Sequence, residues 1–159
     1  MTEVLQQINI TYHPNQDRLL LRARTGANSE LRVWLTRRYA NLLLQVLCTR
    51  MDKAGGIHNL SSDRGTLERF RQGAFDQQYK VESIRAYPLG EEGVLGFRVN
   101  VQDAGAGVTS LQLSPEHGQG LVLNLDPSML YLIFNLLEQA ILQADWCLPS
   151  VSSHKAAIH

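Results

Sequence analysis

Three short runs near the N-terminus alternate apolar and polar residues with a period of two. This spacing puts successive side chains on opposite faces of an extended chain, and it is typical of half-buried β-strands. The runs lie at residues 8–12, 18–25 and 31–35, and residues suited to turns separate them at 13–17 and 26–29. We therefore expect three antiparallel strands that share one apolar face, made of Ile8, Ile10, Tyr12, Leu19, Leu21, Ala23, Leu31, Val33 and Leu35.

The third run leads directly into a segment with helical periodicity. Thr36 precedes this segment, and a threonine hydroxyl can accept a hydrogen bond from an otherwise unpaired amide of a first helical turn. Gly55 and Gly56 follow the segment and favour the end of a helix. We therefore expect an amphipathic helix between them, whose buried stripe consists of Tyr39, Leu42, Leu43, Val46, Leu47 and Met51.

The C-terminal half repeats this order of patterns. Strands are predicted at 80–87, 93–102, 110–114 and 121–125, and the second of these has the most regular alternation in the chain. Asp126-Pro127 then predicts a helix start, because the carboxylate can cap free amides and proline needs no hydrogen bond at the first position. Apolar residues cover more than one side of this second helix, which predicts either a central core helix or a subunit interface. They are Leu130, Leu132, Ile133, Phe134, Leu136, Leu137 and Ile141.

These patterns predict an α+β fold with two antiparallel sheets, each followed by a long helix. The order is βββα and then ββββα, which suggests a weak internal duplication. We expect one domain over residues 1–146, with halves 1–54 and 80–146 joined by 55–79, and a flexible tail at 147–159. The joining segment is polar, and it is the best candidate for a mobile or partner-binding loop.

Composition supports a globular protein without a structural metal or disulfide framework. Of 159 residues, 44% are apolar and 19% are charged, as in soluble single domains. Cys48 and Cys147 have neither a C-x-x-C nor a zinc-ligand spacing, so we expect both to be reduced core residues. The N-terminus has no basic segment followed by an apolar run, and no apolar stretch is long enough to span a membrane. We therefore expect a cytoplasmic protein that does not enter the membrane.

Charge is distributed unevenly, although the net charge is zero. Residues 1–80 contain 12 basic and 7 acidic side chains and residues 81–159 contain 3 and 8, so the halves carry +5 and −5. This asymmetry could let the halves attract each other, let subunits pair head to tail, or leave a basic face for an anionic partner. The sequence leaves these three alternatives open.

The basic residues concentrate on the predicted first sheet. Arg22, Arg24, Arg32 and Trp34 would project from its outer face, near Arg37 and Arg38 at the start of the first helix. Guanidinium groups bind phosphates and an exposed indole can stack on a base, so these six residues are a candidate site for single-stranded nucleic acid. The alternative is a solvated sheet face on which arginine stems or a neighbouring subunit cover Trp34. The neutral net charge favours that alternative.

Arg37 and Arg38 are placed unfavourably for the helix dipole, because a first helical turn prefers anionic side chains. The simpler explanation is a compensating carboxylate, such as Glu30 or an acid of the second half. The other explanation is a bound anion or phosphate where the helix amides and the two guanidinium groups converge.

The sequence predicts no catalytic, metal-binding or cofactor-binding residues. The histidines His13, His58, His117, His154 and His159 fall in predicted turns or in the tail, without metal-ligand spacing. Glu91-Glu92 lies in a turn, and the glycines of DAGAG at 103–107 lack the following helix that a phosphate-binding loop needs. No serine or cysteine has a nucleophile-elbow context. An enzyme whose site is assembled from scattered residues remains a third alternative.

Two resemblances extend this picture. The strings DRLLLR and LRVWLTRRY, within about residues 17–47, resemble a signature of small uncharacterised bacterial proteins, which implies a bacterial source and brings no known activity. The predicted topology of sheet and helix repeats is similar to that of Whirly and PUR-repeat proteins, a resemblance that implies single-stranded nucleic acid binding. None of the motifs of these two families is matched residue by residue, and the first half has three clear strands.

Together, the patterns favour a non-enzymatic binding or assembly module that acts through self-association or a protein partner. The apolar second helix and the opposite charges of the halves motivate this hypothesis. Single-stranded nucleic acid binding is the alternative, through the face that carries Trp34.

Overall fold

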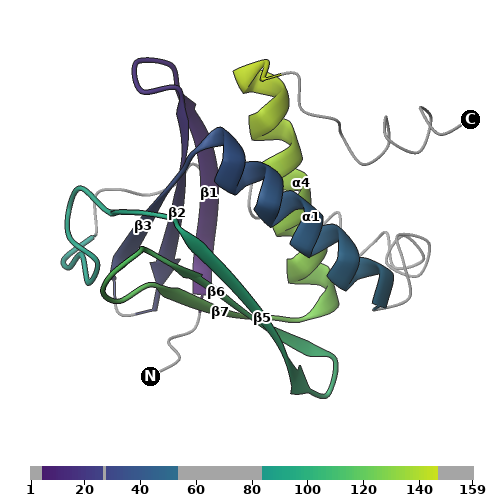
Figure 1. Ribbon diagram of the computed structural model, residues 1–159. Helices are drawn as coiled ribbons and strands as arrows, with labels where there is room; N and C mark the ends of the chain where they lie inside the picture. Colours follow the sequence, from purple (N-terminus) through teal and green to yellow (C-terminus); the bar gives the residue numbers. More distant parts are fainter. Residues whose placement is uncertain (1–4, 27, 54–83, 147–159) are drawn as a thin grey trace, which may run out of the picture.

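The computed structural model describes residues 5–26, 28–53 and 84–146, and it has the predicted α+β architecture. Two sheets and two long helices make up this part of the chain (Figure 1). The predicted joining segment at 55–79 and the predicted tail at 147–159 lie outside the described residues.

The first sheet confirms the period-two pattern of the N-terminal runs. β1 (Leu5–His13), β2 (Arg18–Thr25) and β3 (Glu30–Leu35) are neighbouring antiparallel strands. Leu21 lies opposite Ile10 on one side and opposite Val33 on the other. Because register partners point to the same face of a sheet, the predicted apolar residues form one inner face. The fully buried members are Leu19, Leu21, Ala23, Val33 and Leu35.

Helix α1 (Arg37–Lys53) begins where the sequence predicts it. The Tyr39 amide donates a hydrogen bond of 3.2 Å to Thr36 Oγ1, as a helix cap requires. The buried stripe, however, is rotated relative to the predicted one: Leu44 is buried, whereas Leu42 is 42% exposed. The reason is that α1 packs against the second helix as well as against the strands. Periodicity shows that a helix has an apolar side, but it does not show which residues a second neighbouring element will bury.

The second sheet contains β5 (Arg98–Gly105), β6 (Val108–Ser114) and β7 (Leu121–Leu125), antiparallel and in that spatial order. Alternate residues of β6 and β7 form its inner face, and all of them are buried: Leu111, Leu113, Leu121, Leu123 and Leu125. β5 is an edge strand and is much more exposed than the other two.

The most regular run of the sequence, 93–102, is divided between the two sheets. Its first part forms β4 (Val94–Leu95), which pairs parallel with β3, and the rest belongs to β5. Two successive amides belong to different sheets: Gly96 N donates to Trp34 O and Phe97 N donates to Ser114 O. The expectation of one continuous strand in an antiparallel sheet was therefore wrong here, because alternation specifies a face and not a neighbouring strand.

The predicted strand at 80–87 is described only over its last four residues. These make an isolated parallel bridge between Ala86 and Ser29, and not a regular strand. The Glu30 amide also donates to Ala86 O at 3.0 Å, so this segment lies along the start of β3.

Helix α4 (Pro127–Ala144) packs mainly against α1 and β1, beside α1 in Figure 1. Asp126 caps it through a hydrogen bond of 2.8 Å from the Met129 amide, as predicted. Contacts with α1, β1, β6 and β7 cover its predicted apolar residues, including Leu132 and Leu136. These residues are therefore buried as in a core helix, whereas Leu142, which was not among them, is 66% exposed. Neither of the described helices has the length and apolar content needed to cross a membrane.

Candidate functional site

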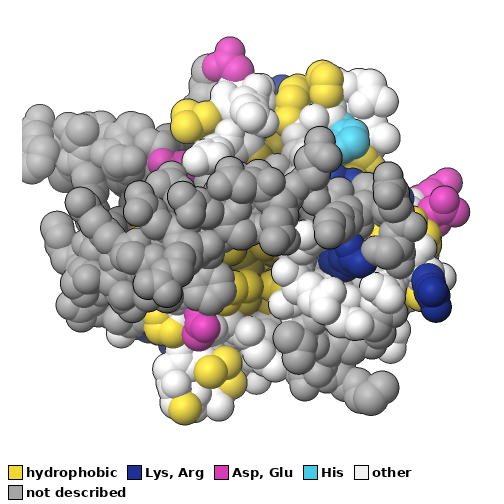
Figure 2. Space-filling view, turned by 180° about the vertical axis from the view of Figure 1, so that it is seen from behind, with side chains coloured by type: hydrophobic (Ala, Val, Ile, Leu, Met, Phe, Trp, Pro, Cys, Tyr) yellow, Lys and Arg dark blue, Asp and Glu magenta, His cyan; other side chains and the backbone are white. Residues whose placement is uncertain are grey.

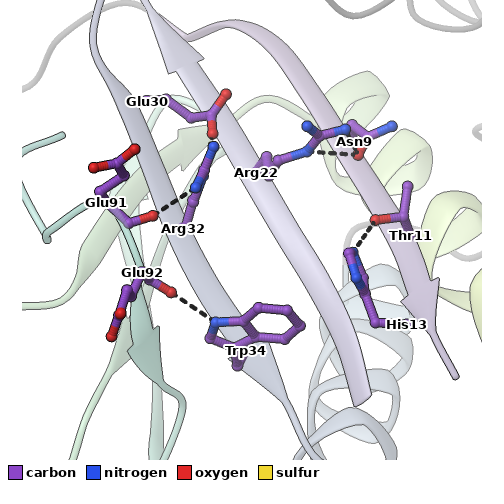
Figure 3. A network of polar contacts seen from close by, with 9 residues as sticks. All are labelled: Asn9, Thr11, His13, Arg22, Glu30, Arg32, Trp34, Glu91 and Glu92. Carbon is purple, nitrogen blue, oxygen red and sulfur yellow. Dashed lines mark hydrogen bonds and ion pairs between the residues drawn. The ribbon is translucent and has the colours of Figure 1, made fainter. Parts of the chain in front are cut away.

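The strand register brings the predicted basic and aromatic residues to the outer face of the first sheet. Arg22 lies opposite Arg32, and Arg24 lies opposite Glu30. Trp34 projects from the same face, as Figure 3 shows. The residues that the sequence placed on one face of the sheet therefore do lie together. Whether they are free to bind a ligand depends on the contacts that each side chain already makes.

Two of the arginines are held by asparagine side chains. Arg22 donates from Nε and from one terminal nitrogen to Asn9 Oδ1 on β1, at 3.2 and 3.0 Å. Arg24 donates to Asn28 Oδ1 at 3.1 Å and is only 7% exposed. A burial this deep leaves little of the Arg24 guanidinium for an external phosphate.

Arg32 is held by three groups. It forms an ion pair with Glu30, which is fully buried, and donates to the backbone carbonyl of Glu91. Its guanidinium also lies over the Tyr87 ring, 4.9 Å from the ring centre. Such a cation–π contact and a paired, buried carboxylate neutralise much of the field that would attract an anion.

Trp34 is fixed on both sides. Its Nε1 donates to Glu92 O at 2.7 Å, and the His13 ring meets it edge to face with ring centres 5.0 Å apart (Figure 3). His13 Nε2 in turn lies 3.2 Å from Thr11 Oγ1. The sequence placed His13 in a turn and missed this role. The sequence feature that could have predicted it is the alternation of Asn9, Thr11 and His13, which puts His13 on the outer face at the end of β1.

Arg37 and Arg38 behave differently from each other. Arg37 forms an ion pair with Asp17 and lies over the Trp146 ring at 5.6 Å. The compensating-carboxylate explanation therefore fits Arg37, but the partner is Asp17 and not Glu30 or an acid of the second half. Arg38 is exposed, and its guanidinium makes no ion pair within the described part of the chain.

Asp17 is the centre of a cluster that the sequence did not reveal. Its carboxylate accepts hydrogen bonds from Trp146 Nε1 at 2.7 Å, from Arg37 Nε at 2.9 Å and from the Tyr12 hydroxyl at 2.9 Å. These bonds, led by the one from Trp146, lower the pKa of Asp17 below its ordinary value. The bond to Asp17 raises the pKa of Tyr12. The cluster joins the β1–β2 turn to the start of α1 and to Trp146, two residues beyond the end of α4, which is a structural role.

No continuous basic surface is visible on the coloured part of the face in Figure 2, where cationic side chains occur as separate patches. The described residues also contain no group of three potential metal ligands. A cavity of about 520 Å³ between the sheets is lined mainly by leucines, glycines and glutamines, with no titratable side chain.

A different surface is open at the border between α1 and β5. A groove of about 330 Å³ separates them there, with Leu42, Val46 and Val101 as its apolar lining and Arg50 and Lys53 at one end. Arg50 is held in place, since it donates to Thr109 Oγ1 at 2.9 Å and lies 3.6 Å from an Asp103 carboxylate oxygen.

Comparison of the chain with protein-family models, with curated proteins and with solved structures gives no match. The resemblances to a bacterial signature and to Whirly and PUR-repeat topology therefore stay predictions.

Proposed function

We propose that this protein is a non-enzymatic assembly module that acts by associating with a second copy of itself. The observation that carries the proposal is the distribution of the exposed large apolar side chains. Three of the five in the described residues belong to α1, to β4 and to the short link into β5: Leu42, Leu95 and Phe97, which are 42%, 44% and 53% exposed. The other two are Val122 on β7 and Leu142 on α4. Exposed side chains of this size on adjoining elements are typical of an interaction surface.

The original motive for self-association needs one change. The predicted apolar stripe of α4 is covered within the chain, so that stripe is not the proposed contact, although Leu142 of the same helix is 66% exposed. The opposite charges of the two halves also act in part within the chain, for example between Arg50 of α1 and Asp103 of β5. Support for association therefore comes from the β5 border and no longer from α4.

The test is the mass of the full chain in solution. Sedimentation velocity or light scattering at micromolar concentration should give about twice the monomer mass of 17.8 kDa, or a larger multiple. A monomer mass across the accessible concentration range would reject the proposal.

Single-stranded nucleic acid binding is distinguished in the same samples by titration with oligonucleotides. Arg22, Arg32, Trp34 and Arg37 would have to exchange their present partners for phosphates or bases, which weakens the case for this alternative. Fluorescence quenching at low salt that is lost in Trp34→Phe, with no change in mass, would favour nucleic acid binding over assembly.

A further inference from the structure

We infer that two copies meet edge to edge through β5, so that two three-stranded sheets become one sheet of six strands. This inference rests on the proposed function and specifies its contact surface. β5 of one copy would pair antiparallel with β5 of the other about a two-fold axis near the middle of the strand.

The first argument is the open edge of β5. β6 lies on one side of this eight-residue strand, and on its other side the described residues include no strand. Proteins usually protect such edges with lysine, proline or a bulge. Residues 98–102 contain neither lysine nor proline, and the irregularity in pairing occurs only between Asp103 and Gly105, at the far end. The first five residues can therefore accept another strand.

The second argument is that the layer over β5 is incomplete. Val99 and Val101 lie opposite Leu113 and Leu111 of β6 and share their inner face. The two leucines are fully buried, whereas the two valines are only partly buried. Cover over the sheet thus decreases toward β5, where Phe97 is more than half exposed.

A two-fold partner would supply both missing parts. It would add a strand beside β5 and bring its own α1 next to the exposed Leu42 of the first copy. The groove lined by Leu42, Val46 and Val101 would then lie under the seam between the two helices. Both layers of the fold, strands and helices, would continue across the contact.

The third argument is the charge pattern of the strand itself. β5 has Arg98 at its start and Asp103 near its end, both exposed. Because these residues are five apart, their side chains project from opposite faces of the strand. Antiparallel pairing about the middle of the strand then places the two copies of Arg98, and the two copies of Asp103, at opposite ends of the contact. Like charges are thereby kept apart, as cross-strand pairing favours.

The other edge of the same sheet is β7, and it fits less well. It has five residues, and its inner leucines, Leu121, Leu123 and Leu125, are at most 4% exposed. An added strand at β7 would gain backbone hydrogen bonds but would cover no exposed apolar inner face. β5 offers both.

Two matched pairs of variants test the inference in the full chain. Asn100→Cys and Asn124→Cys place a thiol on exposed, outward positions of β5 and β7, in a background with Cys48 and Cys147 replaced by serine. A short bismaleimide should cross-link Asn100→Cys into a covalent dimer and leave Asn124→Cys monomeric on a denaturing gel. Phe97→Lys and Val122→Lys, at positions 53% and 47% exposed, should differ in the same way. We expect the dissociation constant to rise about tenfold or more for Phe97→Lys only, because a lysine at each end of the seam would put a charge on the apolar surface that the contact covers.

Each alternative outcome is decisive. A wild-type chain that is monomeric at all concentrations rejects the proposed function and this inference together. A dimer that is cross-linked through Asn124→Cys, or weakened by Val122→Lys, overturns the inference and leaves the proposed function intact. A dimer that responds to neither pair, but dissociates when the exposed Leu142 is replaced by lysine, likewise moves the contact from β5 to α4.

Discussion

The two halves of the fold have the same order of elements but use their surfaces differently. β1, β2, β3 and α1 form one unit, and β5, β6, β7 and α4 form the other, each with three antiparallel strands and a capped helix. In the first unit, long polar side chains on the outer face are fixed by partners from other segments. In the second, the predicted apolar residues of the helix are buried, while the described residues place no strand beside the outer edge of β5.

This difference shows that surface composition alone does not reveal availability. The first unit looks like a binding surface in sequence because it is rich in arginine. The guanidinium groups of Arg22, Arg24, Arg32 and Arg37 are, however, engaged with carboxylates, amide oxygens, carbonyls and aromatic rings. The sequence of β5 gives no sign of a binding surface, yet its inner-face valines, Val99 and Val101, are only partly covered by the described residues. Substitutions at equivalent positions of the two units, compared by their effect on stability, test this difference.

The largest effects are expected in the shared core. Leu43 of α1 and Leu137 of α4 are both fully buried, so Leu43→Ala and Leu137→Ala should each lower the free energy of unfolding by about 2–5 kcal/mol. Because the helices pack against each other, both variants should lower the midpoint of one common unfolding transition. Chemical denaturation followed by circular dichroism and tryptophan fluorescence measures this. Two separate transitions would show that the halves are independent domains, contrary to the predicted single domain over 1–146.

The link between the two sheets should be nearly as sensitive. A Cβ atom added at Gly96 would lie 2.6 Å from Tyr39 Cε1, so Gly96→Ala should cost about 1–3 kcal/mol through overpacking. The Tyr39 hydroxyl also donates to Arg98 O at 2.8 Å, and burial raises the pKa of this tyrosine. Both facts fix the ring beside the link.

A double-mutant cycle separates this clash from a general loss of glycine. Tyr39→Leu removes the ring, so Gly96→Ala should cost less free energy of unfolding in that background than in the wild type. Equal costs in the two backgrounds would mean that the ring does not determine the need for glycine at this position.

Gly96 also marks the limit of what alternation could predict. The period-two and helical patterns identified the strands and both long helices, because burial of one face is a local property of the sequence. They could not show that the run 93–102 changes sheets after Leu95, since the choice of neighbouring strand depends on residues far away in the chain. The closeness of the Tyr39 ring is such a non-local property.

The same limit applies to the candidate site. Register follows from alternation, and the outer face with Arg22, Arg32 and Trp34 was therefore predictable. Their partners were not, because the Glu91 and Glu92 carbonyls are more than 50 residues away in sequence and are backbone groups that every residue possesses. For Arg37, the sequence suggested a carboxylate but offered no means to choose Asp17.

Helix caps give a smaller and more nearly equal comparison of the two units. Thr36→Ala and Asp126→Ala should each cost about 1 kcal/mol of stability, because each leaves a first-turn amide without its side-chain acceptor. Thr36→Ser and Asp126→Asn keep an acceptor oxygen and are the matched controls. Thermal or chemical unfolding provides the measurement. A loss in the serine and asparagine variants as large as in the alanine variants would argue against a capping role.

The smallest effect is expected at Asp17, and its pH dependence distinguishes the closed first unit from the open second one. The pKa of Asp17 is lowered in the folded protein, so its ionised form stabilises the fold above the pKa of an unfolded aspartate, near 4. That contribution is lost as the pH falls through the lower folded-state pKa. Asp17→Asn should therefore lower the melting temperature at neutral pH, and the difference from the wild type should shrink in acid.

Because Asp17 and Arg37 are both substantially exposed, the ion pair is screened and the difference should also decrease at high salt. Asp52→Asn, at an exposed position on α1 with no ion pair to another described residue, is the matched control and should show neither dependence. If the difference in melting temperature between Asp17→Asn and the wild type does not change with pH, the charge of Asp17 does not contribute to stability. The bonds from Trp146 and Tyr12 would then depend only on an acceptor oxygen at this position, which asparagine also provides. The contacts of Asp17 would then be hydrogen bonds that do not depend on its charge. Arg37 would in that case be held less firmly than an ion pair with Asp17 implies.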